Sequence, residues 1–357
     1  VLDEHARFPS ALPVRREVDY AAWVTIQIGC DNACAFCIVP AVRGREMSRP
    51  FGEVVEEVAR LAADGVTEVT LLGQNVNSYG RDITLKLRGE HTTARAAEAA
   101  GASWAADGRA RSLFPDLLRE VGSVPGIRRV RYTSPHPKDM RPETFAAMAD
   151  TPTVCEHLHY PLQSGSDRIL AAMHRGYTAE RYLERLVAAR SAIDDLAVST
   201  DIIVGFPGET DEDFAGTLEV ASAAEYDYAY TFIFSPRRGT EAAELTDRFV
   251  DPAAAGERFQ RLRVVIERSA LAKHRARIGR IEEVLVEGPS KKDPSITSGR
   301  TRQNKLVHFV PPRPLRTGSY ATVEVTDAAP HHLVGRFVEL VAEATHRTRI
   351  PVAASVE

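Results

Sequence analysis

Residues 30–37 read CDNACAFC, and the prediction of the fold starts from this stretch. It places Cys30, Cys34 and Cys37 at the spacing C-x3-C-x2-C, while the fourth cysteine of the chain, Cys155, lies far downstream. Structural zinc sites and the usual ferredoxin patterns take four protein ligands. Three thiolates would leave one iron of a 4Fe-4S cluster open to the amine and carboxylate of S-adenosylmethionine.

Two alternatives stay open for the cysteines, namely a zinc site completed by a distant ligand and buried structural thiols. The three cysteines share one loop that directly follows the β-branched run of residues 23–28. This specific combination of spacing and position argues against both alternatives. Phe36 lies between the second and third cysteine. Its ring is either part of the core or a face for the adenine of the ligand, or both.

Composition excludes several classes of protein. The chain has 357 residues with a formal net charge of -4, so overall charge does not indicate a nucleic-acid partner. No apolar run approaches the roughly 18 residues of a membrane span, and four cysteines do not form a disulfide framework. We expect a cytoplasmic protein of more than one domain. Residues 1–20 are expected to be the remnant of a linker, with something missing upstream.

Strand-like and helix-like segments alternate along most of the chain. Strands are expected at 23–28, 66–72, 129–133, 156–162, 198–204 and 228–234, with helical spacing at 54–62, 117–121, 179–193 and 212–224. About six such units predict an α/β fold whose parallel sheet curls into a full or partial (βα)6 barrel over residues 21–277. An alanine-rich stretch near 88–112 is expected to be a flexible insertion.

The pattern changes after a long, basic helix expected at 253–278. Short strands at 281–287, 306–310, 320–325 and 333–340 are separated by Pro and Gly turns, which predicts a small antiparallel β-barrel over residues 278–343. Residues 344–357 are expected to be a disordered tail. Small barrels with basic loops bind looped RNA. The candidate RNA contacts of this barrel are Lys291, Lys292, Arg300, Arg302, Lys305, Arg313 and Arg316.

Polar loops follow the expected strands, where the chemistry of such barrels is located. Gly73 and Gly205 permit close backbone approach to a ligand, the amide and hydroxyl groups of 163–166 suit a ribose, and Arg175 suits a carboxylate. Each loop also fits a purely structural role as a turn, a helix cap or an exposed arginine. His136 is not expected to be a ligand, and Cys155 is expected to be an inert small hydrophobe.

Motifs occur in order through the chain: the three cysteines, GQNVN at 73–77, SPHP at 134–137, QSGSD at 163–167 and VGFPGET at 204–210. Together they resemble those of the methylthiotransferase family of radical S-adenosylmethionine enzymes. The resemblance covers essentially all of residues 21–340, and the C-terminal barrel is similar to the TRAM domain of these enzymes. The loop LGQNVNSY at 72–79 favours the branch that modifies tRNA over the branch that modifies a ribosomal protein.

The resemblance implies an activity and a site. The family inserts sulfur and a methyl group at C2 of an isopentenylated adenosine beside the anticodon, using one S-adenosylmethionine as methyl donor and another as the source of a radical. The implied partners are the tRNA anticodon stem-loop and an electron donor such as flavodoxin or ferredoxin, and we expect a monomer. The cluster ligands would be Cys30, Cys34 and Cys37. The S-adenosylmethionine contacts would be Gly73, Gln74, Ser134, Gln163, Ser164, Arg175 and the backbone of Val204, Gly205 and Phe206.

The chain departs from the family pattern at its N-terminus. Family members carry a second 4Fe-4S cluster on three further cysteines, whereas none of the 29 residues before Cys30 is a cysteine. We therefore expect the second cluster only in a missing upstream domain. Two alternatives stay open for the function: methylthiolation of a ribosomal protein, and an RNA-binding module in which the cluster is structural.

Overall fold

The computed structural model describes residues 18–89 and 111–346. Its strands are β1 (Ala21–Thr25), β2 (Gln27–Ile28), β3 (Met47–Ser48), β4 (Glu68–Leu72), β5 (Arg129–Tyr132), β6 (His157–His159), β7 (Ala197–Val204), β8 (Tyr228–Ile233), β9 (Ile281–Pro289), β10 (Thr297–Thr301), β11 (Leu306–Val310), β12 (Tyr320–Ala329) and β13 (His332–Ala342). Its α-helices are α1 (Val39–Arg43), α2 (Phe51–Ala63), α3 (Arg81–Gly89), α5 (Phe114–Ser123), α6 (Pro142–Asp150), α7 (Asp167–Ala172), α8 (Ala179–Ala192), α9 (Asp211–Ala224), α10 (Glu241–Glu244) and α11 (Pro252–Arg275). Short 3-10 helices are η1 (Val76–Ser78), η3 (Pro137–Asp139) and η4 (Thr246–Arg248).

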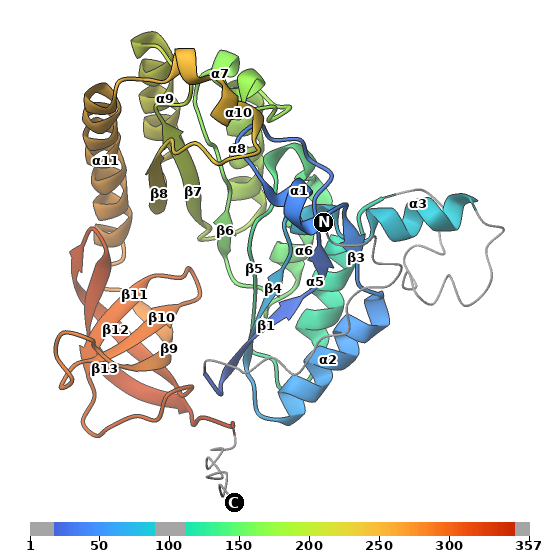
Figure 1. Ribbon diagram of the computed structural model, residues 1–357. Helices are drawn as coiled ribbons and strands as arrows, with labels where there is room; N and C mark the ends of the chain where they lie inside the picture. The colour runs from blue at the N-terminus through green and yellow to red at the C-terminus, as the bar shows by residue number, and fades with distance from the viewer. Residues whose placement is uncertain (1–17, 90–110, 347–357) are drawn as a thin grey trace, which may run out of the picture.

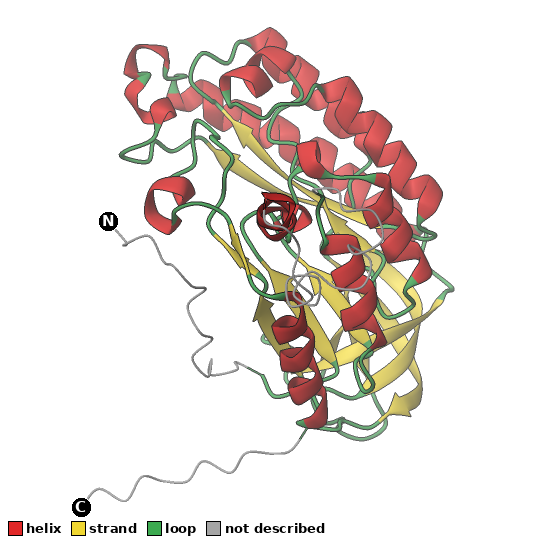
Figure 2. Cartoon of the chain, turned by 90° about the vertical axis from the view of Figure 1, so that its right-hand side faces the viewer, coloured by secondary structure: helices red, strands yellow, loops and turns green. Residues whose placement is uncertain are grey.

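The larger body contains two three-stranded parallel sheets, in the orders β1-β4-β5 and β6-β7-β8. A parallel bridge between Val130 and Val154 leads from the first sheet toward the second. No pairing between β1 and β8 occurs among the described strands, so the barrel is not closed. Helices lie along the outside of the strands (Figures 1 and 2). The predicted partial barrel of six parallel strands is therefore confirmed.

Alternation along the strands separates two faces of each sheet. Val24 of β1 and Val69 of β4 are fully buried in the same cluster as Val54 and Val58 of α2, so this face packs against the helices. Val198, Ile202 and Val204 of β7 belong to the same buried cluster. Because side chains alternate along a strand, the residues between them point to the opposite, inner face of the barrel.

The smaller body is a closed barrel with the strand order β10-β11-β13-β12-β9 (Figure 1). Its core contains Val284, Val286, Phe309 and Val323. Two details differ from the prediction. β11 and β13 run parallel, so the barrel is not wholly antiparallel, and β10 was not predicted because its residues, TSGRT, are polar or glycine.

Arginines of β5 join the two bodies through backbone groups. Arg129 is fully buried and donates to the carbonyl oxygens of Arg300 at 2.8 Å and Glu283 at 3.0 Å. Arg131 donates to the carbonyls of Thr301 and Arg302, both at 2.9 Å. These bonds hold the 300–302 segment of the small barrel against the β5 strand.

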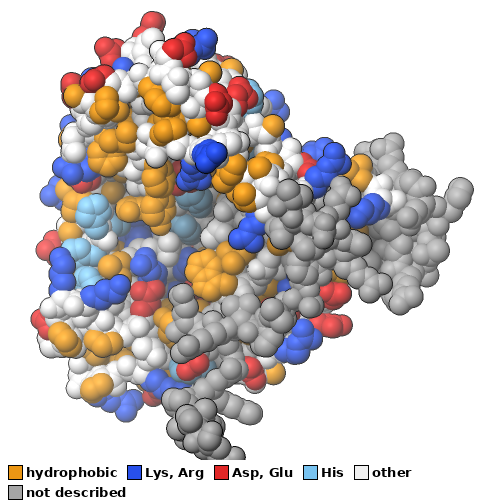
Figure 3. Space-filling view, in the orientation of Figure 1, with side chains coloured by type: hydrophobic (Ala, Val, Ile, Leu, Met, Phe, Trp, Pro, Cys, Tyr) orange, Lys and Arg blue, Asp and Glu red, His pale blue; other side chains and the backbone are white. Residues whose placement is uncertain are grey.

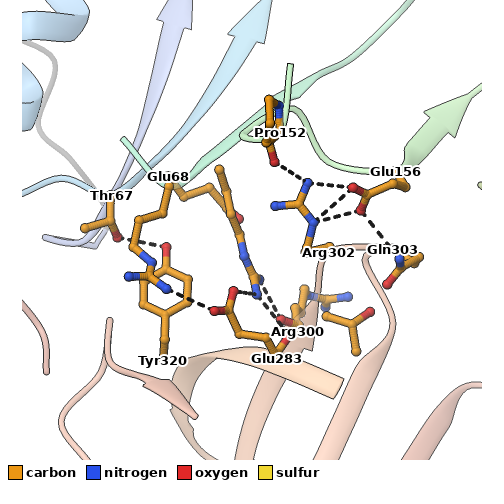
Figure 4. A network of polar contacts seen from close by, with 12 residues as sticks. Thr67, Glu68, Pro152, Glu156, Glu283, Arg300, Arg302, Gln303 and Tyr320 are labelled. Carbon is orange, nitrogen blue, oxygen red and sulfur yellow. Dashed lines mark hydrogen bonds and ion pairs between the residues drawn. The ribbon is translucent and has the colours of Figure 1, made fainter. Parts of the chain in front are cut away.

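Side-chain pairs extend this contact. Arg302 pairs with Glu156 at 2.7 Å, and the hydroxyl of Tyr320 donates to that of Thr67 at 3.0 Å (Figure 4). Lys305 pairs with Asp227 at 2.6 Å. Buried, hydrogen-bonded charges have strict geometric requirements, so the small barrel docks in one defined orientation.

Some predicted segments lie partly or wholly outside the described residues. Residues 1–17 of the linker, 90–110 of the insertion and 347–357 of the tail belong to this group. The start of the predicted disordered tail is ordered instead: the hydroxyl of Thr345 donates to the carbonyl of Gly65 at 2.9 Å, and His346 is buried. Within the described residues, no helix combines the length and apolar character that a membrane span requires.

Candidate functional site

The cysteine loop, residues 29–37, is fixed by backbone hydrogen bonds to three other segments. Cys30 donates its N–H to the carbonyl of Gly44 at 3.2 Å, and Ala35 donates to Met173 at 3.2 Å. Ala242 of α10 in turn donates to the carbonyl of Ala35 at 2.9 Å. A loop held at several points along its length presents its side chains in a reproducible arrangement.

Gly29 makes the entry to this loop possible. Its φ of +73° lies in the left-handed region, and a Cβ there would stand 2.0 Å from the carbonyl oxygen of Arg45. Only glycine fits both conditions. The β1–β2 segment thus ends in a glycine that lets the chain turn closely against the 44–46 segment.

All three cysteines of the loop line one cavity of about 270 Å³. The wall consists of segments that follow β2, β4, β5 and β6, together with the loop after α7. This volume is near the lower end of the range of small-molecule sites, roughly 300 Å³ and above. The lining residues are Cys30, Asn32, Cys34, Phe36, Cys37, Val39, Gly73, Gln74, Ser134, His136, Gln163 and Arg175.

Arg175 places a positive charge in the cavity wall. It is buried, and its guanidinium donates to Cys34 Sγ at 3.3 Å and to the hydroxyl of Tyr177 at 3.1 Å. The hydroxyl of Tyr177 in turn donates to the carbonyl of Leu162 at 2.9 Å. Although burial alone favours the neutral form, Tyr177 and Cys34 raise the pKa of Arg175 above its usual value. The charge therefore persists at any working pH.

Three polar atoms in the cavity wall have no hydrogen-bond partner among the described residues: Gln74 Oε1, Gln163 Oε1 and His136 Nε2. His136 Nδ1 accepts from the N–H of Lys138 at 3.2 Å, so in the neutral ring the proton is on Nε2. Burial, with Arg175 and Lys138 nearby, lowers the pKa of His136 to about 2. The wall thus offers two acceptors and one donor to a ligand.

Two lining residues adopt a backbone conformation that side chains usually avoid. Ser134 has φ +58° and Gln163 has φ +69°. Such residues cost about 1–3 kcal/mol each and cluster at ligand sites. The N–H of Gln163 donates to the carbonyl of Asp201 at 2.8 Å, and its carbonyl accepts from the N–H of Ile203 at 2.9 Å. The neighbouring strand β7 therefore fixes the position of the Gln163 backbone.

The segment that forms this cavity matches a known family. Residues 24–221, more than half of the chain, match the model of the radical SAM superfamily, and they contain every lining residue of the cavity. The chain belongs to the radical SAM superfamily. Residues 275–338 match the TRAM domain.

Two similar curated relatives of this radical SAM chain share one name. The tRNA-2-methylthio-N(6)-dimethylallyladenosine synthase of Acidothermus cellulolyticus is 49% identical over 330 residues, covering 92% of this chain and 61% of that protein. The protein of the same name from Mycolicibacterium vanbaalenii is 49% identical over 333 residues, with the same shares covered. The chain thus spans about 61% of the length of these relatives.

A solved structure with a similar fold is the radical S-adenosylmethionine methyltransferase TsrM from Kitasatospora setae. It is 16% identical, covers 62% of this chain and 38% of that chain, and gives a TM-score of 0.44.

Membership in the radical SAM superfamily implies a 4Fe-4S cluster and S-adenosylmethionine, and the donor set of the cavity fits both. Among the described residues, no three Cys, His, Asp or Glu side chains converge on one metal ion. A 4Fe-4S cluster takes each thiolate on a different iron, and the cavity wall supplies three thiols. Burial, and then the neighbours Cys34, Glu46 and Cys37, raise the pKa of the Cys30 thiol.

Four predicted contacts of the radical SAM site lie outside the cavity lining. Ser164 is buried, with its hydroxyl 3.3 Å from that of Thr217. Gly205 donates its N–H to Glu209 Oε2 at 2.8 Å, and the carbonyl of Val204 accepts from Phe234 at 2.8 Å. Phe206 packs behind the cysteine loop, in one cluster with Ala35 and Met173. Their contact with S-adenosylmethionine remains a prediction.

His136 is a lining residue that the sequence does not single out. The prolines of SPHP account for the loop without a ligand, so the pattern gives this histidine no separate role. Its position at the end of β5, the third strand of the first sheet, was the available signal, since chemistry in such folds is found at strand ends.

Of the seven predicted RNA contacts of the TRAM barrel, Arg313 pairs with Glu343 at 3.4 Å and Arg316 donates to the carbonyl of Ala344 at 3.3 Å. The other five fall into two groups. Lys291 and Lys292 are exposed, and Arg300 is half-exposed and pairs with Glu287 at 2.9 Å. Arg302 and Lys305 are instead engaged with the radical SAM body, through Glu156 and Asp227 respectively. These two side chains face the domain contact, so in this arrangement they are not surface cations.

Proposed function

We propose that this chain is the catalytic core of a tRNA methylthiotransferase that acts at C2 of N6-isopentenyladenosine next to the anticodon. The observation that carries the proposal is the cavity in which three thiols meet Arg175, Gln74, Gln163 and His136. The name shared by the curated relatives supports the substrate. We also propose a monomeric, cytoplasmic enzyme that receives electrons from a donor protein such as flavodoxin or ferredoxin.

In this proposal, Cys30, Cys34 and Cys37 hold the cluster through thiolates. When bound, the cluster and S-adenosylmethionine supply reductive bond cleavage and the abstraction of hydrogen from the substrate carbon. Arg175 donates to the sulfur of Cys34 and places a positive charge where a carboxylate would bind.

The remaining lining residues orient S-adenosylmethionine. The unpartnered oxygens of Gln74 and Gln163 accept from an ammonium or from ribose hydroxyls, and His136 donates through Nε2–H. Phe36 offers an apolar face to the adenine. Their contacts inside the protein hold these groups in place before the ligand arrives, which reduces the entropic cost of binding.

The test is anaerobic reconstitution of the chain with iron and sulfide, followed by an assay for 5′-deoxyadenosine in the presence of S-adenosylmethionine and a reductant. Replacing any one of Cys30, Cys34 or Cys37 by alanine is expected to abolish the product. Cys155→Ala is the matched control, because Cys155 is buried away from the cavity and should leave the product unchanged. A reconstituted chain that forms no 5′-deoxyadenosine would favour a structural cluster on an RNA-binding module.

The substrate is tested separately. We expect methylthiolation of an isopentenylated anticodon stem-loop, and not of a ribosomal protein, once a sulfur source is available. A second cluster needs thiols that this sequence does not supply, since the cavity uses three of its four cysteines. We therefore expect sulfur insertion to require residues outside this sequence, and methylthiolated tRNA produced by this chain with sulfide alone would contradict that expectation.

A further inference from the structure

The inner face of the second sheet carries large apolar side chains that nothing in the described structure covers. Tyr228, Tyr230 and Phe232 alternate along β8 and are 41%, 49% and 49% exposed. Their register partners on β7 are Ser199, Asp201 and Ile203, which lie on the same face. Exposed aromatic residues in a row along one strand are unusual for a monomer surface and mark an interaction site.

The first sheet contributes a fourth ring. Trp23 of β1 is 57% exposed, whereas its neighbours Ala22 and Val24 are buried against the helices. Alternation therefore puts Trp23 on the inner face of the barrel. In a closed barrel these inner positions would be filled by side chains from the other strands; here they line an open hollow. Figure 3 shows hydrophobic and histidine side chains gathered in the hollow between the larger body and the small barrel.

This face is continuous with the cavity of the cysteines. Ile203, the register partner of Phe232, packs in one cluster with Phe36 and Phe206. In the middle of the row, Tyr230 makes an edge contact with His159, with ring centroids 6.1 Å apart. His159 lies 3.3 Å from Asp201 Oδ2 and so adds polar atoms beside the rings. The aromatic row thus leads from the small-barrel side of the sheet toward the cavity.

Unpaired cations surround the cavity end of the row. Arg43, Arg45, Arg237 and Arg238 are exposed, and none has an ion pair or a side-chain hydrogen bond within the part of the chain that the structure describes. The 237–239 segment begins four residues after β8 and approaches the end of the cysteine loop, since a Cβ on Gly239 would be 3.3 Å from Ile38, the residue after Cys37.

Two nearby acidic side chains form no ion pair with these arginines among the described residues. Asp31 accepts from the N–H of Glu46 at 3.1 Å, and Glu241 lies 3.6 Å from His174. The cations are therefore available to a polyanion, and a row of rings flanked by free arginines is complementary to nucleobases on a phosphate backbone.

We propose that Trp23, Tyr228, Tyr230 and Phe232 form a stacking surface for the unpaired bases of an RNA loop, which leads the substrate base to the cavity. This inference rests on the proposed function, which it extends to named contacts. Unpaired bases stack on aromatic side chains whatever their identity, while base-paired RNA hides those faces. The surface should therefore discriminate loop RNA from duplex RNA.

The experiment measures binding of a fluorescent isopentenylated anticodon stem-loop to the full chain by anisotropy, with a fully paired RNA of equal charge beside it. Tyr230→Leu, Phe232→Leu and Trp23→Leu keep apolar bulk and remove the ring. Each is expected to weaken stem-loop binding about fivefold or more and to leave duplex binding unchanged. Tyr230→Phe should retain binding, and Val187→Ala, an exposed apolar residue on the outer helix α8, is the surface control.

A photoreactive base in the RNA loop provides a second measurement on the unsubstituted chain, independent of how the variants fold. Cross-links on the peptides of β1 and β8 are expected. Unchanged affinity in the leucine variants, equal losses for duplex RNA, cross-links confined to the TRAM barrel, or binding of a peptide in place of RNA would each overturn the inference. Formation of 5′-deoxyadenosine without RNA tests the proposed function separately, so failure of one leaves the other standing.

Discussion

Replacing Lys305 by methionine distinguishes a structural lysine from an RNA contact. Its ammonium is buried and lies 2.6 Å from Asp227 Oδ1, across the contact between the small barrel and β8. Burial lowers the pKa of Lys305, and Asp227 opposes this shift. Asp227 Oδ2 also accepts from the N–H of Val198 at 2.8 Å. Methionine keeps most of the apolar stem and removes the ammonium together with its hydrogen bond to Asp227.

The magnitude follows from what remains. At 2.6 Å and an effective dielectric constant near 20, the two charges attract by about 6 kcal/mol, and burying them costs several kcal/mol each. The net contribution of the intact pair to the free energy of unfolding is therefore close to zero. Lys305→Met leaves the Asp227 carboxylate buried without its cation, so we expect the free energy of unfolding to fall by about 3–5 kcal/mol. Asp227→Asn in the same chain should recover much of this loss.

Urea unfolding of the single and double variants measures the coupling, and stem-loop binding across salt concentrations measures the RNA contact. Lys292→Met is the control: this exposed residue should leave stability within about 0.5 kcal/mol and, as an RNA contact, should lower the salt slope by about one. If Lys305→Met changed stability by less than about 1 kcal/mol and lowered the salt slope instead, our reasoning about the domain contact would be wrong.

Three further outcomes are expected. Gly29→Ala should reduce stability and iron retention far more than Gly44→Ala, because both residues have positive φ but only Gly29 would place a Cβ against backbone; equal losses in thermal unfolding and iron content would contradict this. Arg175→Met should weaken S-adenosylmethionine binding by about tenfold or more, the value of one charged hydrogen bond, in equilibrium dialysis, whereas Arg168→Met on the exposed side of α7 should not. Burial lowers the pKa of His274 to about 4, so the unfolded chain binds the extra proton below about 6.5 and stability falls as pH drops from 6.5 to 4; at pH 5 the loss should be about 2 kcal/mol relative to pH 7. Urea unfolding of His274→Asn at both pH values should show a smaller difference, and an unchanged difference would assign it to other groups.

Most of the cavity lining could be predicted from the sequence because the lining residues follow consecutive parallel strands. Gly73, Ser134 and Gln163 each stand at the end of a β-branched or apolar run, and the ends of parallel strands meet at one edge of a sheet. Ser164 lies next to such a position, yet its hydroxyl lies 3.3 Å from that of Thr217 and outside the cavity lining. One residue of displacement reverses the direction of a side chain on a strand, and a loop has no period from which to read it.

The domain contact was not predictable in the same way. In the sequence, Arg302 and Lys305 look like RNA-binding residues of a basic barrel loop. Their partners, Glu156 and Asp227, lie 146 and 78 residues away, so the ion pairs are not visible there. Nothing local distinguishes a cation that meets a distant carboxylate from one that meets solvent. The β10 strand escaped prediction for a related reason, since its pairing with β9 and β11 supplies the order that its polar residues do not.

The bonds from Arg129 and Arg131 to backbone carbonyls have a consequence for protein engineering. These arginines donate to the carbonyl oxygens of residues 300–302, so the bonds depend on the path of the main chain and not on the identity of the side chains there. Side chains in this segment can therefore diverge without disturbing those bonds, provided that the loop keeps its length. A TRAM barrel taken from a distant relative should dock on this body if its corresponding loop follows the same path and if it keeps counterparts of Arg302 and Lys305 for Glu156 and Asp227. RNA preference could then be exchanged while the cavity is left intact.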